Sequence, residues 1–296
     1  MSSALSALAI AFLYKNLMFL AEKWGNSNSP YIKWFCAALS LNVLAGFEFI
    51  EQSLLIEVYS LHLALLMLLF YSLSRKVYLW TGLITGLALA NHSTAIYFFA
   101  FTLLWLVFID KIPLKNLIKP GLTRFLPGAL LGLTPYLYLL FVYDPLNPLQ
   151  WGDPSHWTGF KEIVFRTNYW RLPENSFSKI WSNHVIAMGH FLNQWVIVIP
   201  ILFASSLFLY ISKKYSWKKE VLVWHICWVI QLPIMSYLAD MGINDEGMKL
   251  SSVFYIPSYF FTAFGILYLW PILKKLNPIA PKIAPLLLLL TFFGNW

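Results

Sequence analysis

A long stretch between two apolar regions carries residue types suited to binding a phosphate. The pattern from Thr158 to Tyr169 predicts an amphipathic helix lying on a membrane surface, with Arg166 on its polar side. The planar guanidinium of arginine donates two parallel hydrogen bonds to phosphate oxygens. We therefore expect this segment either to cap a helical bundle or to cover a lipid-linked substrate, with Arg166 and Tyr169 near its phosphate.

Other polar residues stand at the ends of apolar stretches, and each allows two interpretations. Glu57 is either paired with a neighbouring helix or binds an acceptor and handles its proton. Asn91 and His92 separate two short apolar runs, where His92 is either a structural hydrogen bonder or part of a cavity lining. Lys249 either meets a phosphate or pairs with Glu246.

Metal and nucleotide chemistry has little support in the sequence. It contains no P-loop, no dinucleotide-binding glycine pattern, no HExxH and no CxxC motif. Asp153 precedes a proline and predicts a turn first. Asp240, Asp245 and Glu246 offer oxygen ligands to a divalent cation, but their spread over a glycine-containing loop favours solvation. We expect no metal site, no firmly bound cofactor and no disulfide.

The composition indicates which kind of structural element positions these residues. Of the 296 residues, 59% are apolar or aromatic and 11% are charged, whereas soluble domains carry roughly 25% charged residues. The mean hydropathy is +0.65. These values exclude a soluble enzyme, a disordered chain and a disulfide-stapled secreted domain. Because a membrane-spanning helix needs about 20 apolar residues, the chain has room for about ten.

We predict an all-α, polytopic transmembrane bundle that forms one integral-membrane domain over residues 1–296. The predicted spans are 4–21, 33–50, 54–74, 77–91, 94–110, 123–142, 194–211, 220–238, 252–272 and 282–294. The connection at 143–193 is far longer than a typical loop. Its tryptophans, Trp151 among them, suit the membrane interface.

Charges alternate along the junctions between these spans. Fifteen of the 21 basic residues fall in odd-numbered junctions, and ten of the 13 acids fall on or beside even-numbered ones. Short positively charged loops stay in the cytoplasm. We therefore predict that the odd junctions are cytoplasmic and that the N-terminus, the acids and the 143–193 connection are extracytoplasmic. The net charge of +8 then reflects orientation, and no long basic run indicates nucleic acid.

Five short blocks occur in an order that resembles a known family. They are Glu57-Val-Tyr-Ser-Leu-His62, Gly86-Leu-Ala-Leu-Ala-Asn-His-Ser-Thr94, Pro135-Tyr136, Trp151-Gly-Asp-Pro154 with Phe160, Arg166 and Tyr169, and Phe254-Tyr-Ile-Pro-Ser-Tyr259. Over most of the chain this order resembles the membrane protein O-mannosyltransferases that include transmembrane protein 260. That family is widespread in bacteria as a domain of unknown function and looks like a branch of the GT-C glycosyltransferases.

The resemblance implies a bundle that transfers a sugar, such as mannose, from a polyprenyl-phosphate donor to a hydroxyl of a protein or glycan acceptor. The chemistry would occur on the non-cytoplasmic face of a bacterial inner membrane. The family's essential acid would precede Met1, so the catalytic residue is not identified and we expect the chain to be the middle of a longer enzyme. The candidates for substrate binding, including those discussed above, are Glu57, Tyr59, His62, Asn91, His92, Trp151, Asp153, Arg166, Tyr169 and Lys249.

Two other functions stay open at this point. A membrane transporter or lipid flippase would show two related halves and polar groups near the membrane midplane. The sequence instead has no internal repeat and gathers its polar groups at one face. An inactive fragment or accessory subunit is the other alternative, because the expected catalytic acid is missing.

Overall fold

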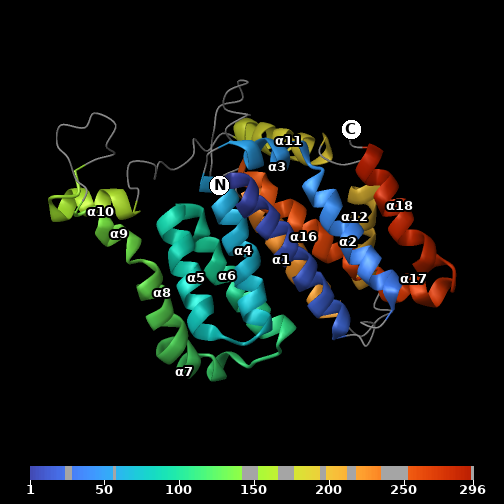
Figure 1. Cartoon of the computed structure of the whole chain (residues 1–296), viewed down its shortest axis with the longest axis horizontal. Coiled ribbons are helices and arrows are strands. Elements are labelled where there is room, and N and C mark those ends of the chain that lie inside the picture. The colour runs from blue at the N-terminus through green and yellow to red at the C-terminus, as the bar shows by residue number, and fades with distance from the viewer. Residues whose placement is uncertain are drawn as a thin grey trace. The chain divides into compact units, whose positions relative to one another are not determined.

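The computed structural model describes residues 1–23, 29–55, 58–141, 153–165, 177–193, 198–211, 218–234 and 253–294. Over these ranges the chain folds into helices joined by turns, with no strand, as the composition predicts. It divides into two compact units, one formed by Met1–Met67 with Pro173–Trp296 and the other by Leu68–Leu172. Figure 1 labels the helices of both units.

Two helices among the described residues are long and apolar enough to cross a membrane, namely Ser2–Glu22 and Val253–Lys275. Up to four spans result if two bent pairs each count as one. These pairs are Pro30–Leu44 with Phe47–Leu54, bent by 68°, and Ser93–Ile109 with Leu114–Tyr138, bent by 118°. The segment 33–50, predicted as one span, is therefore divided at Ala45 and Gly46.

The first unit is built around one buried helix. Its elements are α1 (Ser2–Glu22), α2 (Pro30–Leu44), α3 (Phe47–Leu54), most of α4 (Val58–Ser74), α11 (Phe177–Asn193), α12 (Val198–Ile211), α13 (Lys218–Val229), η6 (Ile230–Ile234), η7 (Val253–Tyr255), α16 (Ile256–Leu267), α17 (Trp270–Leu276) and α18 (Ala280–Gly294). All twelve residues of α16 are buried, as expected for a helix that is apolar on every side. Helices α1, α2, α12 and α13 pack against it, and Figure 1 shows α1, α2 and α16 side by side.

A polar contact joins α2 to α18. The Asn42 amide donates a hydrogen bond of 2.7 Å to the Leu288 carbonyl, and its oxygen accepts one of 2.9 Å from the Thr291 hydroxyl. Side-chain amides and hydroxyls often link helices in this way where water is scarce. Asn42 therefore fixes α18 on the outer side of α2.

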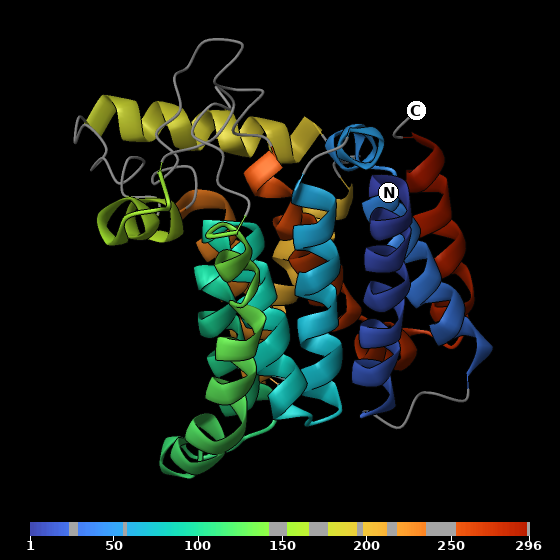
Figure 2. The same ribbon diagram turned by 60° about the vertical axis from the view of Figure 1, so that its left-hand side comes forward.

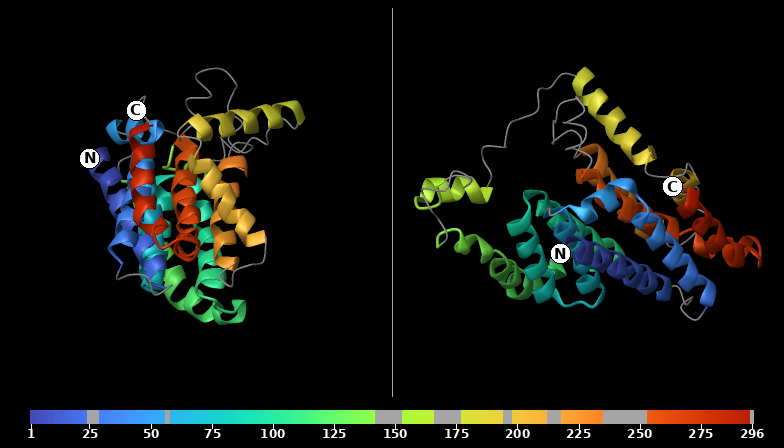
Figure 3. Two further views of the ribbon diagram at one scale, coloured as in Figure 1. Left: turned by 90° about the vertical axis from the view of Figure 1, so that its right-hand side faces the viewer. Right: turned by 45° about the horizontal axis from the view of Figure 1, so that its top comes forward.

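Helix α11 runs crosswise to α18 in Figure 2 and in the left-hand view of Figure 3. Ala187 and Phe191 are buried on one face, where the Phe191 ring lies 5.3 Å from that of Trp228. Trp181 and Val185 are exposed on another face. The 143–193 connection thus contains two helices, α10 (Trp157–Phe165) and α11, where one interfacial helix was predicted.

The second unit contains shorter and more irregular helices. After the end of α4 come α5 (Tyr78–Asn91), η1 (Ser93–Ile96), α6 (Tyr97–Leu104), η2 (Trp105–Ile109), η3 (Leu114–Asn116), α7 (Ile118–Pro120), η4 (Gly121–Phe125), α8 (Leu126–Gly132), α9 (Pro135–Tyr138) and α10. Of these, η1 and η3 are 3-10 turns, and η2 and η4 are π-helical turns.

Glycines bring α5 and α8 into backbone contact. A Cβ atom built on Gly86 would lie 2.1 Å from the Ala129 carbonyl oxygen, and one built on Gly128 would lie 2.1 Å from that of Leu79. Glycines spaced four residues apart, as in the pairs Gly82 with Gly86 and Gly128 with Gly132, allow such close approach in membrane helices. This interface holds the second unit together.

Candidate functional site

Polar side chains of the first unit gather around the short helix α3. Glu48 and Gln52 lie one turn apart on α3, and both are buried. The Tyr259 hydroxyl of α16 donates a hydrogen bond to Glu48 Oε2. A buried carboxylate is costly unless it is hydrogen-bonded, so this contact supports Glu48 and holds α3 against α16.

Two serines extend this cluster to α1 and α4. The Ser60 hydroxyl donates to the Gln52 backbone carbonyl at 2.9 Å and accepts from the Ser6 hydroxyl at 3.2 Å. Gln52 Oε1 is buried, and no described residue donates a hydrogen bond to it. Since buried polar atoms usually have a partner, Gln52 Oε1 is an acceptor that a hydroxyl-bearing ligand or a water molecule would satisfy.

The first unit also brings together two of the sequence blocks. Tyr59 packs edge-on against Phe254, with ring centroids 5.8 Å apart. The Phe254 carbonyl accepts a hydrogen bond from Gln231 Nε2 at 2.5 Å. His62 is buried one turn further along α4. Residues from the block ending at His62 and from the block at 254–259 are therefore direct neighbours.

His92 in the second unit shapes the connection between α5 and α6. Its backbone is extended, and its Nδ1 accepts a hydrogen bond from the Thr94 amide at 3.3 Å and lies 2.8 Å from the Thr94 hydroxyl. The imidazole thus caps η1, and in the neutral ring the proton is on Nε2. Asn91 is the last residue of α5 and is partly exposed.

Tyr136 links this connection to α10. Its hydroxyl lies 2.9 Å from the Leu89 carbonyl of α5 and 3.5 Å from the Val164 carbonyl of α10. Tyr136 thus connects the last turn of α5, which ends at Asn91, with α10.

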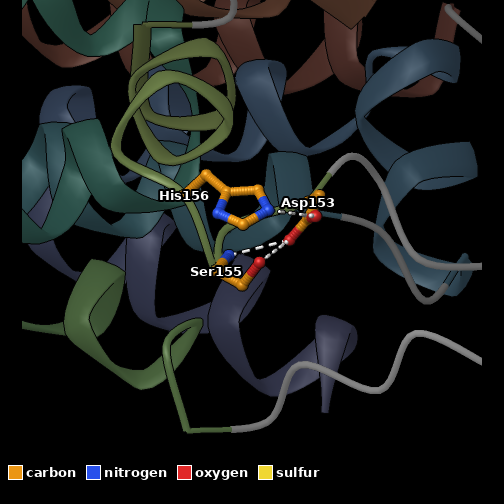
Figure 4. A network of polar contacts seen from close by, with 3 residues as sticks. All are labelled: Asp153, Ser155 and His156. Carbon is orange, nitrogen blue, oxygen red and sulfur yellow. Dashed lines mark hydrogen bonds and ion pairs between the residues drawn. The ribbon is translucent and has the colours of Figure 1, made fainter.

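Asp153 organises the turn before α10, as Figure 4 shows. Its Oδ1 accepts hydrogen bonds from the Ser155 amide at 2.8 Å and the Ser155 hydroxyl at 2.5 Å, and its Oδ2 lies 3.7 Å from His156 Nε2. A Cβ atom on Gly159 would lie 1.9 Å from the Asp153 carbonyl oxygen, so this turn needs a glycine there. These contacts make Asp153 a turn-forming residue, the first of its two interpretations.

The remaining candidates lie outside the described residues. They are Glu57, Trp151, Arg166, Tyr169 and Lys249, together with the acids Asp240, Asp245 and Glu246. Within the ranges given above, no group of three or more His, Cys, Asp or Glu side chains could hold a metal ion. Tyr59 and His62 belong to the first unit, whereas Asn91, His92 and Asp153 belong to the second.

No protein-family model, curated protein or solved structure matches this chain. The functional argument therefore depends on its own residues. Glu48 is one of the acids beside even-numbered junctions that the charge pattern assigns to the extracytoplasmic side, but that pattern does not predict its partner Tyr259 or the role of Gln52. The spacing of Glu48 and Gln52, one helical turn apart in an apolar segment, is the signal that indicates a shared buried face.

Proposed function

We propose that the protein is a multi-pass glycosyltransferase of the GT-C type in a bacterial inner membrane. It moves a sugar, such as mannose, from a polyprenyl-phosphate donor to a hydroxyl group on a protein or glycan acceptor. The reaction takes place on the non-cytoplasmic face, and the bundle has about ten spans.

The observation that supports this proposal is the contact between two sequence blocks that share the family's order. Tyr59 packs against Phe254, and the Tyr259 hydroxyl donates a hydrogen bond to Glu48, so elements about 200 residues apart come together in one region. Its acids belong to the junction that the charge pattern assigns to the extracytoplasmic side. In this scheme Glu48 is a positioning residue, because it holds α3 in place from a buried position.

The chemistry is a single displacement. The acceptor hydroxyl attacks the anomeric carbon, a carboxylate takes the hydroxyl proton, and the bond between the sugar and the lipid phosphate breaks. Because the phosphate is a good leaving group, no general acid is needed, and the anomeric configuration inverts. Arg166, Tyr169 and the Nε2–H of His92 stabilise the charge that develops on the phosphate.

The test uses the purified full-length protein in nanodiscs with isotopically labelled polyprenyl-phosphate mannose and envelope acceptors, read by mass spectrometry. We expect labelled acceptor from the wild type, and a loss of about 100-fold or more in kcat for Arg166→Ala, the effect of losing one charge-stabilising donor. Arg75→Ala removes the same charge from a junction predicted to be cytoplasmic and should keep most of the activity. Wild-type transfer by Arg166→Ala, or no transfer from any polyprenyl-phosphate sugar, would contradict the proposal.

His92 needs a separate pair of variants, because it also caps η1. Asparagine is a good capping residue, so His92→Asn keeps the cap and removes the imidazole Nε2–H, whereas His92→Ala removes both. If His92 acts on the phosphate, both variants lose activity. Activity that is lost in His92→Ala and restored in His92→Asn would assign His92 to structure alone.

A further inference from the structure

A groove in the second unit takes no part in the proposed chemistry. It has a volume of about 170 Å³, and its lining is apolar except for Tyr78 and Thr102. Phe99 and Leu103 form one wall. An apolar cavity of about 150 Å³ is enough to hold benzene, so this groove has room for several methylene groups of a hydrocarbon chain.

Two π-helical turns border the groove. Leu106 belongs to η2, and Gly121 and Phe125 belong to η4. Such turns are rare and frequently occur at functional sites. A Cβ atom built on Gly121 would meet nothing within 4 Å. The groove is therefore open at Gly121. The glycines of α5 and α8, in contrast, are closely packed between those two helices.

One residue of the lining, Thr102, carries a buried hydroxyl that calls for a partner. Thr102 is 6% exposed, and its hydroxyl has no hydrogen-bond partner among the described residues. A buried hydroxyl without a partner lowers stability. A bound molecule that carries a hydrogen-bond acceptor beside an apolar chain would remove this penalty.

The charges at this end of the second unit are almost all positive. Between Leu68 and Phe141 the only acid is Asp110, against six basic residues: Arg75, Lys76, Lys111, Lys115, Lys119 and Arg124. Lys119 and Arg124 are exposed and directly precede the lining residues Pro120 and Phe125. Asp110 accepts a hydrogen bond from Trp105 Nε1 at 3.0 Å.

We propose that this groove binds an anionic phospholipid. One acyl chain fills the apolar channel beside Gly121, the Thr102 hydroxyl donates to an ester carbonyl, and Lys119 and Arg124 attract the headgroup phosphate. An apolar channel next to clustered cations matches the two parts of such a lipid. Basic pockets between membrane helices on the cytoplasmic side are known to bind acidic headgroups. This site is independent of the proposed glycosyl transfer.

Native mass spectrometry of the purified protein, titrated with phosphatidylglycerol or phosphatidylcholine of identical acyl chains, tests the proposal. The wild type should bind phosphatidylglycerol at least about tenfold more tightly. Gly121→Phe fills the channel and should weaken phosphatidylglycerol binding by about tenfold or more. Leu122→Phe adds an aromatic ring at the next, exposed position outside the lining, and should stay within about twofold of the wild type.

Two further variants separate the parts of the site. Thr102→Val keeps the side-chain shape and should weaken binding by about fivefold, the effect of one neutral hydrogen bond. Lys119→Gln with Arg124→Gln should abolish the preference for phosphatidylglycerol over phosphatidylcholine. Wild-type binding by Gly121→Phe, or equal binding of the two lipids by the wild type, would overturn the proposal. If Gly121→Phe does not fold, unchanged binding by the isosteric Thr102→Val and by the charge variant would overturn it instead.

Discussion

The contact between α5 and α8 predicts an unusually costly alanine substitution. In Gly86→Ala the new methyl group would lie 2.1 Å from the Ala129 carbonyl oxygen and 2.8 Å from Gly132 Cα. Ordinary contacts of a Cβ atom begin near 3.4 Å, so the two helices must separate by roughly 1 Å along a tightly packed interface. The substitution therefore acts on the whole interface and not on one residue.

The free energies can be compared directly. Overpacking a close interface costs about 1–3 kcal/mol, and the higher helix propensity of alanine offsets up to about 1 kcal/mol. Loss of contacts along the separated helices adds to the cost. We expect Gly86→Ala to lower the free energy of unfolding by about 2 kcal/mol.

Gly189→Ala in α11 is the matched control, because a Cβ atom there would meet nothing within 4 Å. This variant should raise the free energy of unfolding by about 0.5–1 kcal/mol through backbone entropy. Titration of each protein with sodium dodecyl sulfate in mixed micelles, followed by circular dichroism, measures both values. A Gly86→Ala protein as stable as Gly189→Ala would refute the close packing of α5 on α8.

Three other substitutions test single contacts. Tyr259→Phe removes the donor to buried Glu48 and should cost about 1–3 kcal/mol in the same titration; an unchanged midpoint would show that the hydroxyl does not support the carboxylate. Asn42→Ala breaks the polar link from α2 to α18 and should cost about 0.6–1.7 kcal/mol, measured as a lower thermal midpoint, whereas an unchanged midpoint argues against the link. Tyr136→Phe removes the donor to the Val164 carbonyl, so the amides of α10 should exchange hydrogen faster; equal exchange would contradict that role.

Composition predicts the helical class, because 59% of the residues are apolar or aromatic. Away from water, a helix satisfies the hydrogen bonds of its backbone N–H and C=O groups within one segment. Composition does not predict where a helix ends or bends. The stretch 33–50 is apolar throughout, yet its helix ends at Leu44 and turns by 68° into α3. Hydropathy measures transfer from water and is the same for a straight and a bent helix. Gly46, at the bend, is the local signal that marks a turn.

The site was predicted in parts and not as an arrangement. Tyr59 and Phe254 lie in two of the blocks that carry the family resemblance, but no local pattern specifies a contact between residues so far apart in sequence. The sequence allowed two interpretations of His92. Its capping of η1, through the hydrogen bond from the Thr94 amide, depends on backbone angles that the sequence does not specify. The glycine pairs of α5 and α8 were not used as a prediction, although their spacing of four residues is typical of close helix packing.

The burial of α16 has a consequence for the order in which the chain is made. Its twelve residues pack against α1 and α2, which leave the ribosome about 200 residues before it, and against α12 and α13, which come shortly before it. The faces of α1 and α2 that later cover α16 must wait while about 200 residues are added, roughly 10–40 s at synthesis rates of about 5–20 residues per second. During that interval those faces are not covered by α16. The contacts of α16 with α1 and α2 therefore form long after those two helices have been synthesised.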